Sequence, residues 1–383
     1  MQKIKVMTIF GTRPEAIKMA PVIKKLCETP EIKPITVITA QHREMLDQVL
    51  DLFQIQPDYD LDIMKSGQSL TEITVKVLQG LERVLAETGP DIVLVHGDTS
   101  TTFAASLASF YQKVRIAHVE AGLRTNNKYS PFPEEMNRHL TAVLADLHFA
   151  PTEKSRENLE KENIPADRIF VTGNTVIDAL LETVDADYIF QNKELKDIDF
   201  DNRKVLLLTS HRRENIGEPM KNIFEAALKI IRDNPDTELI FPVHRNPEVR
   251  KLAFSILGGI ERVHLIEPLD YQPFANLMAR SYLVMTDSGG IQEEAPGLGK
   301  PVIVLRDTTE RPEAVEAGTV KLAGTDAGLI YDTVRELITD EEAYKKMANA
   351  VNPYGDGKAA GRIVQRLLFE FGLSDNPGRE FGR

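Results

Sequence analysis

The sequence predicts an α/β fold of two doubly wound domains that face a cleft, and three observations support this expectation. Short β-branched runs alternate with longer helical patterns, which is typical of serial βα units with a parallel sheet. The chain has 383 residues, more than one hydrophobic core usually accommodates. The alternation lapses into a polar, acidic stretch at residues 185–203, and we place the domain linker at or just before it.

Each βα series supplies strand candidates in order along the chain. In the first half the expected strands are Val6–Phe10, Ile35–Thr39, Ile92–His96, Val114–His118 and Leu147–Ala150, and the expected helices are Pro14–Leu26, Leu70–Glu87, Ser100–Tyr111 and Glu134–Ala145. In the second half the expected strands are Val205–Thr209, Leu239–Val243, Val263–Ile266, Leu283–Thr286 and Val302–Leu305. A last helix, Lys358–Phe371, is expected to return to the first domain. We therefore predict an N-terminal domain at 1–172, a C-terminal domain at 173–357 and a returning segment at 358–383.

The formal net charge is −12, and the acidic residues are dispersed along the chain. A negative surface argues against non-specific binding to nucleic acid or to anionic membranes. No window approaches the ~18 consecutive apolar residues of a membrane span, and the first residues lack a signal-peptide pattern, so we expect a cytoplasmic protein. The single cysteine, Cys27, lies in a helical pattern and is expected to be buried rather than to act as a nucleophile.

Cationic residues follow two of the expected strands, at the rim where doubly wound sheets bind ligands. Arg13 and Lys18 surround a helix start after a glycine turn, so phosphate binding is favoured over a capped turn with solvated cations. His211 begins a His-Arg-Arg run in the second half. Such a run next to apolar residues calls for an anionic partner, and a surface turn is the alternative.

The segment Ser288-Gly289-Gly290 passes directly from a strand into a helix. The glycines leave backbone N–H groups unshielded and the helix N-terminus adds its positive end, so a diphosphate fits well. Glu294, one turn into the helix, is placed to accept hydrogen bonds from ribose hydroxyls. A tight turn with Ser288 as the helix N-cap is the alternative, and the phosphate interpretation is preferred.

Carboxylates gather on the same rim in the first half, at Asp98, Glu120 and Glu134. An isolated Asp98 would be interpreted as a helix cap, but together the carboxylates suggest a proton-transfer site. The sequence has no G-x-G-x-x-G after the first strand, no H-E-x-x-H and one cysteine. We therefore expect catalysis without a nicotinamide cofactor or a protein-bound metal.

These clusters together resemble the non-hydrolysing UDP-N-acetylglucosamine 2-epimerases over essentially the whole chain. The resemblance rests on FGTRPEAIKMAP, VHGDTSTT, HVEAGLRT, PFPEEMNR, TSHRREN, DSGGIQEEAPGLGKPV and RDTTERPEA, in that order. It implies two Rossmann-like domains of the glycosyltransferase-B type and reversible conversion of UDP-GlcNAc to UDP-ManNAc for cell-envelope polysaccharides. It also implies a homodimer without cofactors.

The resemblance also assigns roles to residues. The diphosphate would be held by Arg13, His211, Ser288, Gly289 and Gly290, with Glu294 on the ribose. Phe274 would line the uracil pocket, and Leu269 stands where some relatives carry glutamine, so a base contact there must come from the backbone or be lost. The predicted site is completed by Lys18, Asp98, Glu120, Glu134 and Arg311.

The implied chemistry is elimination and re-addition of UDP through 2-acetamidoglucal. We expect Asp98, Glu120 and Glu134 to transfer and position protons and His211 to assist the leaving group. A second, activating UDP-GlcNAc would contact Gln41, His42, Gln68, Arg212 and His244, although Gly67 replaces an arginine found in some regulated members. The alternatives are a hydrolysing epimerase, a glycosyltransferase of the same fold, and a catalytically silent UDP-sugar sensor.

Overall fold

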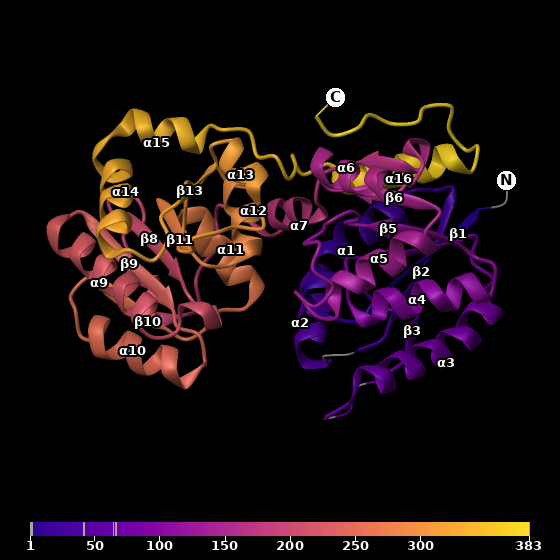
Figure 1. The fold of residues 1–383 in the computed structure, drawn as a ribbon, viewed down its shortest axis with the longest axis horizontal. Helices are drawn as coiled ribbons and strands as arrows, with labels where there is room; N and C mark the ends of the chain where they lie inside the picture. Colours follow the sequence, from indigo (N-terminus) through magenta and orange to yellow (C-terminus); the bar gives the residue numbers. More distant parts are fainter. Residues whose placement is uncertain (1–2, 41–42, 64, 66, 383) are drawn as a thin grey trace. The chain divides into compact units, whose positions relative to one another are not determined.

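The computed structural model describes residues 3–40, 43–63, 65 and 67–382, and it divides into two compact units. The first unit comprises Met1–Ala179 and Tyr354–Arg383, and the second comprises Leu180–Pro353 (Figure 1). The divisions therefore lie at 179/180 and 353/354, where the sequence suggested 172/173 and 357/358. The shift arises because Asp178 belongs to the first unit, where its carboxylate accepts hydrogen bonds from the backbone N–H groups of Ala359 and Ala360.

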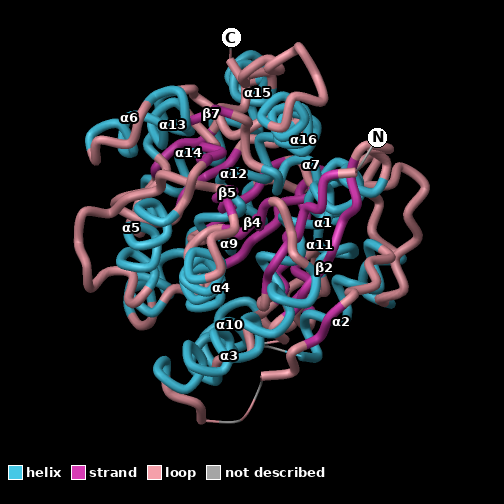
Figure 2. Tube along the Cα trace, turned by 90° about the vertical axis from the view of Figure 1, so that its right-hand side faces the viewer, coloured by secondary structure: helices cyan, strands magenta, loops and turns pink. Residues whose placement is uncertain are grey.

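The described part of the first unit holds a seven-stranded parallel sheet in the order β3-β2-β1-β4-β5-β6-β7. Its strands are β1 (Ile4–Phe10), β2 (Ile32–Ile38), β3 (Tyr59–Asp60), β4 (Ile92–His96), β5 (Arg115–Val119), β6 (Leu147–Ala150) and β7 (Ile169–Val171). Its helices are α1 (Arg13–Cys27), α2 (Arg43–Phe53), α3 (Leu70–Thr88), α4 (Ser100–Tyr111), α5 (Glu134–Leu144), α6 (Glu153–Lys161), α7 (Thr175–Thr183, which spans the division) and α16 (Ala359–Glu370). Helix α4 packs between α3 and α5, and α1 packs against α2 and α16 (Figure 2).

The second unit, all of whose residues are described, holds a six-stranded parallel sheet in the order β10-β9-β8-β11-β12-β13. Its strands are β8 (Lys204–Thr209), β9 (Thr237–Pro242), β10 (Val263–Ile266), β11 (Leu283–Thr286), β12 (Val302–Val304) and β13 (Val320–Leu322). Its helices are α8 (Lys193–Lys196), α9 (Glu218–Asp233), α10 (Pro247–Leu257), α11 (Tyr271–Arg280), α12 (Gly289–Gly297), α13 (Pro312–Glu316), α14 (Ala327–Thr339) and α15 (Glu341–Ala348).

The strand order confirms the predicted doubly wound architecture in each unit. The order reverses between β1 and β4 in the first sheet and between β8 and β11 in the second. The loops that follow these strands therefore flank a topological switch point, where ligands bind in open α/β sheets. Every strand expected from the sequence is present, and the strands that the sequence pattern missed, β3, β7 and β13, contain two or three residues at a sheet edge.

Cys27 is exposed, whereas the sequence analysis expected it to be buried. It is exposed at the last position of α1, because the buried stripe of that helix runs through Ile23 and Leu26 and leaves the next residue facing outward. Partial burial and the nearby Asp58 and Glu28 carboxylates raise the pKa of the Cys27 thiol, which disfavours the nucleophilic thiolate. Among the described residues, no helix has the length and apolar character required to cross a membrane.

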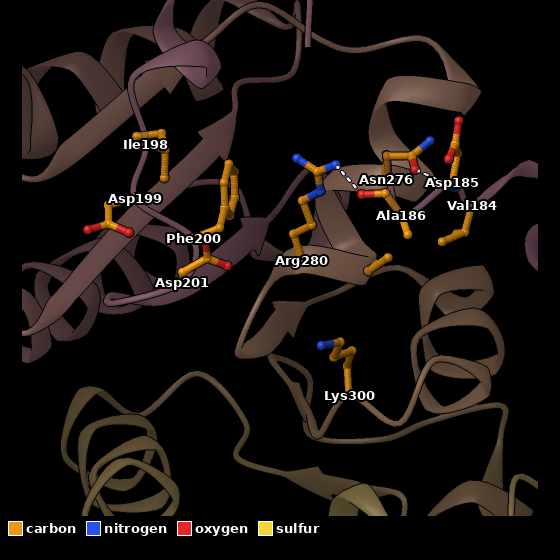
Figure 3. Close-up of a pocket in the computed structure, with 11 residues that line it drawn as sticks. Val184, Asp185, Ala186, Ile198, Asp199, Phe200, Asp201, Asn276, Arg280 and Lys300 are labelled. Carbon is orange, nitrogen blue, oxygen red and sulfur yellow. Dashed lines mark hydrogen bonds between the residues drawn. The ribbon is translucent and has the colours of Figure 1, made fainter. Parts of the chain in front are cut away.

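The acidic stretch at residues 185–203 is part of the second unit, where it packs against the end of α11. Arg280, at the end of α11, donates hydrogen bonds to the carbonyls of Ala186 (3.0 Å) and Tyr188 (2.6 Å), and its guanidinium lies over the ring of Phe190. A cavity of about 700 Å³ opens between this stretch and α11, with Arg280 and Lys300 in its lining (Figure 3). The residues that the sequence assigns to the site do not line this cavity.

Candidate active site

Buried Glu15 joins the two loops at the switch point of the first sheet. Its Oε2 accepts hydrogen bonds from the backbone N–H groups of Gly11 (3.1 Å) and Thr12 (2.8 Å), in the loop after β1. Its Oε1 accepts from the hydroxyls of Thr99 (2.7 Å) and Thr102 (3.1 Å), at the start of α4. Burial raises the pKa of Glu15, and these hydrogen bonds oppose that shift. Glu15 therefore sets the spacing of the loops that carry Arg13 and Asp98.

Lys18 and Glu120 form an ion pair between α1 and the loop after β5. His96 Nε2, at the end of β4, lies 3.7 Å from the same Glu120 oxygen. Burial lowers the pKa of His96 to about 4, so the ring is neutral near pH 7 despite the opposing Glu120 charge. Glu120 has a φ of 59°, a left-handed conformation that costs free energy for a residue other than glycine and is concentrated at functional sites.

Asp98 is not the cap of α4. Thr99 is the N-cap residue, and its hydroxyl accepts a hydrogen bond from the Thr102 N–H. The Oδ2 atom of Asp98 instead accepts hydrogen bonds from Arg138 Nε (3.0 Å) and pairs with Arg138 Nη2 (2.7 Å), while Asn137 Nδ2 donates to the Asp98 carbonyl (2.9 Å). Asp98 Oδ1 accepts no hydrogen bond from the described residues, so one carboxylate oxygen is held and the other is available.

Glu134 and Glu135 are adjacent at the start of α5 but have opposite environments. Glu134 Oε2 is buried and has no hydrogen-bond partner among the described residues. Glu135 is fully buried and accepts hydrogen bonds from the N–H groups of Thr125 and Asn126 and from Arg138. Burial by itself raises the pKa of Glu135, but these hydrogen bonds and the Arg138 charge lower it overall. Glu135 is therefore satisfied structurally, whereas Glu134 retains an open acceptor.

Arg13 opens α1 and is half-buried, with no ion pair or hydrogen bond to any described residue. The residue stands at the N-terminus of α1, and the N-terminus of a helix favours an anion. Pro14 occupies the first turn, as the sequence predicts, and lacks the N–H group that would have no partner there. These features agree with a phosphate-binding role for Arg13, which remains a prediction.

In the second unit, buried Asp287 joins the loop after β11 to the loop after β8. Its carboxylate accepts hydrogen bonds from the N–H groups of His211 (2.9 Å) and Arg212 (3.0 Å), from Ser210 Oγ (3.1 Å) and from Asn215 Nδ2 (3.1 Å). Asp287 is fully buried, and these four donors satisfy its carboxylate. It therefore orders the His-Arg-Arg run at the second switch point, in the same way that Glu15 orders the first.

Two guanidinium groups converge on the N-terminus of α12. A Cβ atom built on Gly289 would lie 3.8 Å from Arg212 Nη2 and 4.0 Å from Arg311 Nη2. Arg311 is oriented by an ion pair with buried Glu293, and Arg212 Nε is buried without a partner among the described residues. Two cations at an uncovered helix N-terminus form an anion cradle suited to a diphosphate.

The other residues expected at the cradle lie on the same elements. Ser288 is the N-cap residue of α12, as the alternative interpretation had it, but its hydroxyl makes no capping hydrogen bond. The Glu294 carboxylate turns back toward the start of the helix, where its Oε1 lies 3.3 Å from a Cβ position built on Gly290. Leu269 precedes α11 and Phe274 lies on it, and both are half-buried.

The His211 ring stacks on the ring of His244, with centroids 5.5 Å apart and planes inclined by 21°. Burial lowers the pKa of His211, the Asp287 carboxylate opposes this shift, and His244 and Arg212 add to it. His211 Nδ1 lies 3.5 Å from Asp287 Oδ1, so the same carboxylate that holds its loop also faces its ring.

The residues proposed for a second UDP-GlcNAc are distributed over both units. Gln41 and His42 lie outside the described residues. Gln68 precedes α3 in the first unit, where its Oε1 accepts a hydrogen bond from the Lys65 N–H at 2.6 Å. In the second unit His244 stacks on His211, and Arg212 lies at the anion cradle.

Several residues of the site have no role in the sequence analysis, although the quoted motifs contain them: Glu15, Glu135, Asn137, Arg138 and Asp287. Each of these residues contacts another segment of the chain. The motifs alone do not indicate which charged residues connect two segments and which contact the substrate. The structure reveals them through the burial of Glu15, Glu135 and Asp287, because a carboxylate without partners is rarely buried.

Comparisons with known proteins identify the family of the chain. A sequence model of the family described as UDP-N-acetylglucosamine 2-epimerase matches residues 24–368. The UDP-N-acetylglucosamine 2-epimerase of Bacillus subtilis is 59% identical over 97% of each chain. The structure of MnaA from S. aureus with UDP has a TM-score of 0.88 at 51% identity and covers 99% of this chain and 100% of its own.

A further structure, the UDP-GlcNAc 2-epimerase of Neisseria meningitidis bound to UDP-GlcNAc, has a TM-score of 0.84 at 57% identity. The alignment covers 96% of this chain and 100% of the Neisseria chain. The similarity extends through both units, whose two parallel sheets give the glycosyltransferase-B-like fold. The chain belongs to the UDP-N-acetylglucosamine 2-epimerase family and is an epimerase.

Proposed function

We propose that the chain interconverts UDP-GlcNAc and UDP-ManNAc without hydrolysis, by elimination and re-addition of UDP through 2-acetamidoglucal. The observation that carries this proposal is that the two units present different chemical groups. The second presents an anion cradle, and the first presents carboxylates with unoccupied oxygens. Two related proteins bind an anion of this kind: MnaA of S. aureus binds UDP, and the epimerase of Neisseria meningitidis binds UDP-GlcNAc.

The second unit holds the leaving group in this proposal. Arg212 and Arg311 contact the diphosphate together with the N–H groups of Gly289 and Gly290, and Glu294 accepts hydrogen bonds from the ribose. Phe274 contributes to the uracil pocket. The cations stabilise the negative charge that develops on UDP as the C1–O bond breaks. His211 assists this step as a hydrogen-bond donor, because burial disfavours its charged form.

The first unit transfers the protons. A carboxylate oxygen takes the C2 proton, the C–H electron pair forms the C1–C2 double bond, and UDP departs with the C1–O electron pair. Re-addition of UDP with protonation on the opposite face of C2 completes the inversion. We assign these transfers to Asp98 Oδ1 and Glu134 Oε2, which have no donor among the described residues, and a positioning role to Glu120, which Lys18 neutralises.

The test is proton NMR of the purified chain with UDP-GlcNAc in deuterated water. The proposal requires UDP-ManNAc to appear and deuterium to enter C2 of both nucleotide sugars. Free ManNAc and UDP would instead identify a hydrolysing epimerase. An unchanged spectrum would leave the glycosyltransferase and the silent sensor as the alternatives.

The proposal extends to the setting of the reaction. UDP-ManNAc would supply cell-envelope polysaccharides, and deletion of the gene should remove ManNAc from the envelope. A second UDP-GlcNAc would bind at Gln68 and His244, together with Gln41 and His42, and would share Arg212 with the diphosphate of the first. Hyperbolic kinetics with UDP-ManNAc as the substrate, without any requirement for added UDP-GlcNAc, would argue against this regulation.

A further inference from the structure

We propose that Arg138 is a positioning residue that selects the reactive oxygen of Asp98. The inference rests on the proposed function, in which Asp98 transfers the C2 proton. It concerns a residue of α5 that the sequence analysis did not assign, and it follows from the pattern of hydrogen bonds around one carboxylate.

Arg138 occupies only one oxygen of Asp98. Its Nε and Nη2 atoms lie 3.0 and 2.7 Å from Asp98 Oδ2, and Oδ1 accepts no hydrogen bond from the described residues. Hydrogen bonds from a cationic donor are short and strong, so Oδ2 is stabilised as a charged acceptor. Oδ1 is therefore the Asp98 oxygen that exchanges a proton with C2 on one face of the sugar, while Glu134 serves the opposite face. The guanidinium sets the orientation of Oδ1.

Arg138 is itself held in place by a second carboxylate. Its Nη1 donates to Glu135 Oε2 at 3.0 Å, and Glu135 is fixed by the N–H groups of Thr125 and Asn126. The planar guanidinium can reach both carboxylates at once, whereas a lysine ammonium is a single point charge on a flexible stem. The next residue toward the N-terminus, Asn137, binds the Asp98 carbonyl. Adjacent residues of α5 thus fix both the backbone and the side chain of Asp98.

This arrangement predicts a loss of turnover without a loss of substrate affinity. Arg138→Met should lower kcat by about 100-fold, because small misplacements of a reacting group have effects of this size. The KM for UDP-GlcNAc and the affinity for UDP should change by less than about 3-fold, since the cradle for UDP lies on other residues. Arg138→Lys keeps the charge and should restore part of kcat.

Arg156 provides the matched control. It is a poorly exposed arginine of the same unit, with 11% of its side chain exposed against 14% for Arg138, and it pairs with Glu380 rather than with a residue of the site. Arg156→Met and Arg156→Lys should lower Tm through loss of that ion pair and leave kcat unchanged. If the Arg138 and Arg156 variants with equal Tm had equal kcat, the positioning role would be rejected.

A double-mutant cycle gives the decisive comparison. If Arg138 acts through Asp98, Arg138→Met should cause less than about a 2-fold further loss of C2 deuterium exchange in an Asp98→Asn background. A full, multiplicative loss would overturn the proposal. If Arg138→Met does not fold, Arg138→Lys replaces it in the same cycle. Absence of UDP-ManNAc with the unaltered chain would reject the proposed function, whereas normal turnover of the Arg138 variants would reject only this inference.

Discussion

At the scale of single residues, Glu134 and Glu135 show how hydrogen-bond partners distinguish two adjacent acids that the sequence alone does not separate. Both are acidic residues at the start of α5, yet Glu135 has several donors and Glu134 Oε2 has none among the described residues. Replacing Glu134 should therefore affect the reaction more than the fold. Replacing Glu135 should affect the fold first, because buried donors would lose their acceptor.

We predict that Glu134→Gln lowers kcat by about 100-fold or more, which is the usual contribution of a proton-transfer group. Its Tm should stay close to that of the unaltered chain. Glu135→Gln should lower Tm clearly, because its amide places a donor against the donors that Glu135 binds. Thermal unfolding and turnover of both variants test the pair. The assignment fails if Glu134→Gln retains full turnover.

His148 makes a pH-dependent contribution to stability. It is buried, and neither ring nitrogen has a hydrogen-bond partner among the described residues. Burial, followed by the charges of His118 and Arg124, lowers its pKa to about 3. The unfolded chain, with an ordinary histidine pKa near ~6.5, binds a proton that the folded chain does not. The contribution of the neutral, buried ring to the free energy of unfolding is therefore complete above the pKa of the unfolded chain. It declines as the pH falls below that value.

We predict that this decline is absent in His148→Phe. The free energy of unfolding of the unaltered chain, relative to the variant, should fall by about 1.4 kcal/mol per pH unit between about pH 6 and pH 4.5. Chemical denaturation of both chains across this range measures the difference, and groups that do not interact with His148 contribute equally to both chains. A constant difference would show that His148 titrates normally in the folded state.

At the scale of elements, both units use the same device at their switch points. A buried carboxylate, Glu15 in one and Asp287 in the other, joins the loops after the two strands where the order reverses. The sequence was sufficient to predict the strands, because their β-branched runs are long and central. It was not sufficient to identify these bridges, because each depends on donors that other segments supply only after folding. The choice between Asp98 as cap and Asp98 as site residue depended on Arg138 for the same reason.

Gly11 and Gly361 give a matched prediction for these elements. A Cβ atom on Gly11 would lie 2.0 Å from Thr39 Oγ1 and 2.8 Å from Thr101 Oγ1, whereas one on Gly361, within α16, meets no atom within 4 Å. Gly11→Ala should therefore lower Tm and turnover by displacing the loop that carries Arg13. Gly361→Ala should stabilise the first unit by about 0.5–1 kcal/mol through helix propensity. Equal Tm values for the two variants would contradict the close packing at Gly11.

At the scale of the whole molecule, charge and exposed apolar surface point to different partners. The net charge of −12 is compatible with an anionic ligand, because the cations of the cradle lie close together at one helix end and act locally. The apolar surface instead favours a protein partner. Met136, Leu140 and Val143 of α5 are 37%, 41% and 79% exposed and recur at the spacing of one helix face. Phe110, at the end of the neighbouring α4, is 56% exposed.

We propose that this face of α5 binds a second copy of the chain, because contiguous apolar patches mark interfaces whereas single exposed side chains are common. Val143→Glu should then convert a dimer into a monomer in light scattering. Val351→Glu is the control, since Val351 is also a valine and is 80% exposed. Repulsion between two chains of charge −12 is screened by salt, so the dimer should be more stable at higher ionic strength. A dimer that survives Val143→Glu, or a monomeric unaltered chain, would remove α5 as the interface.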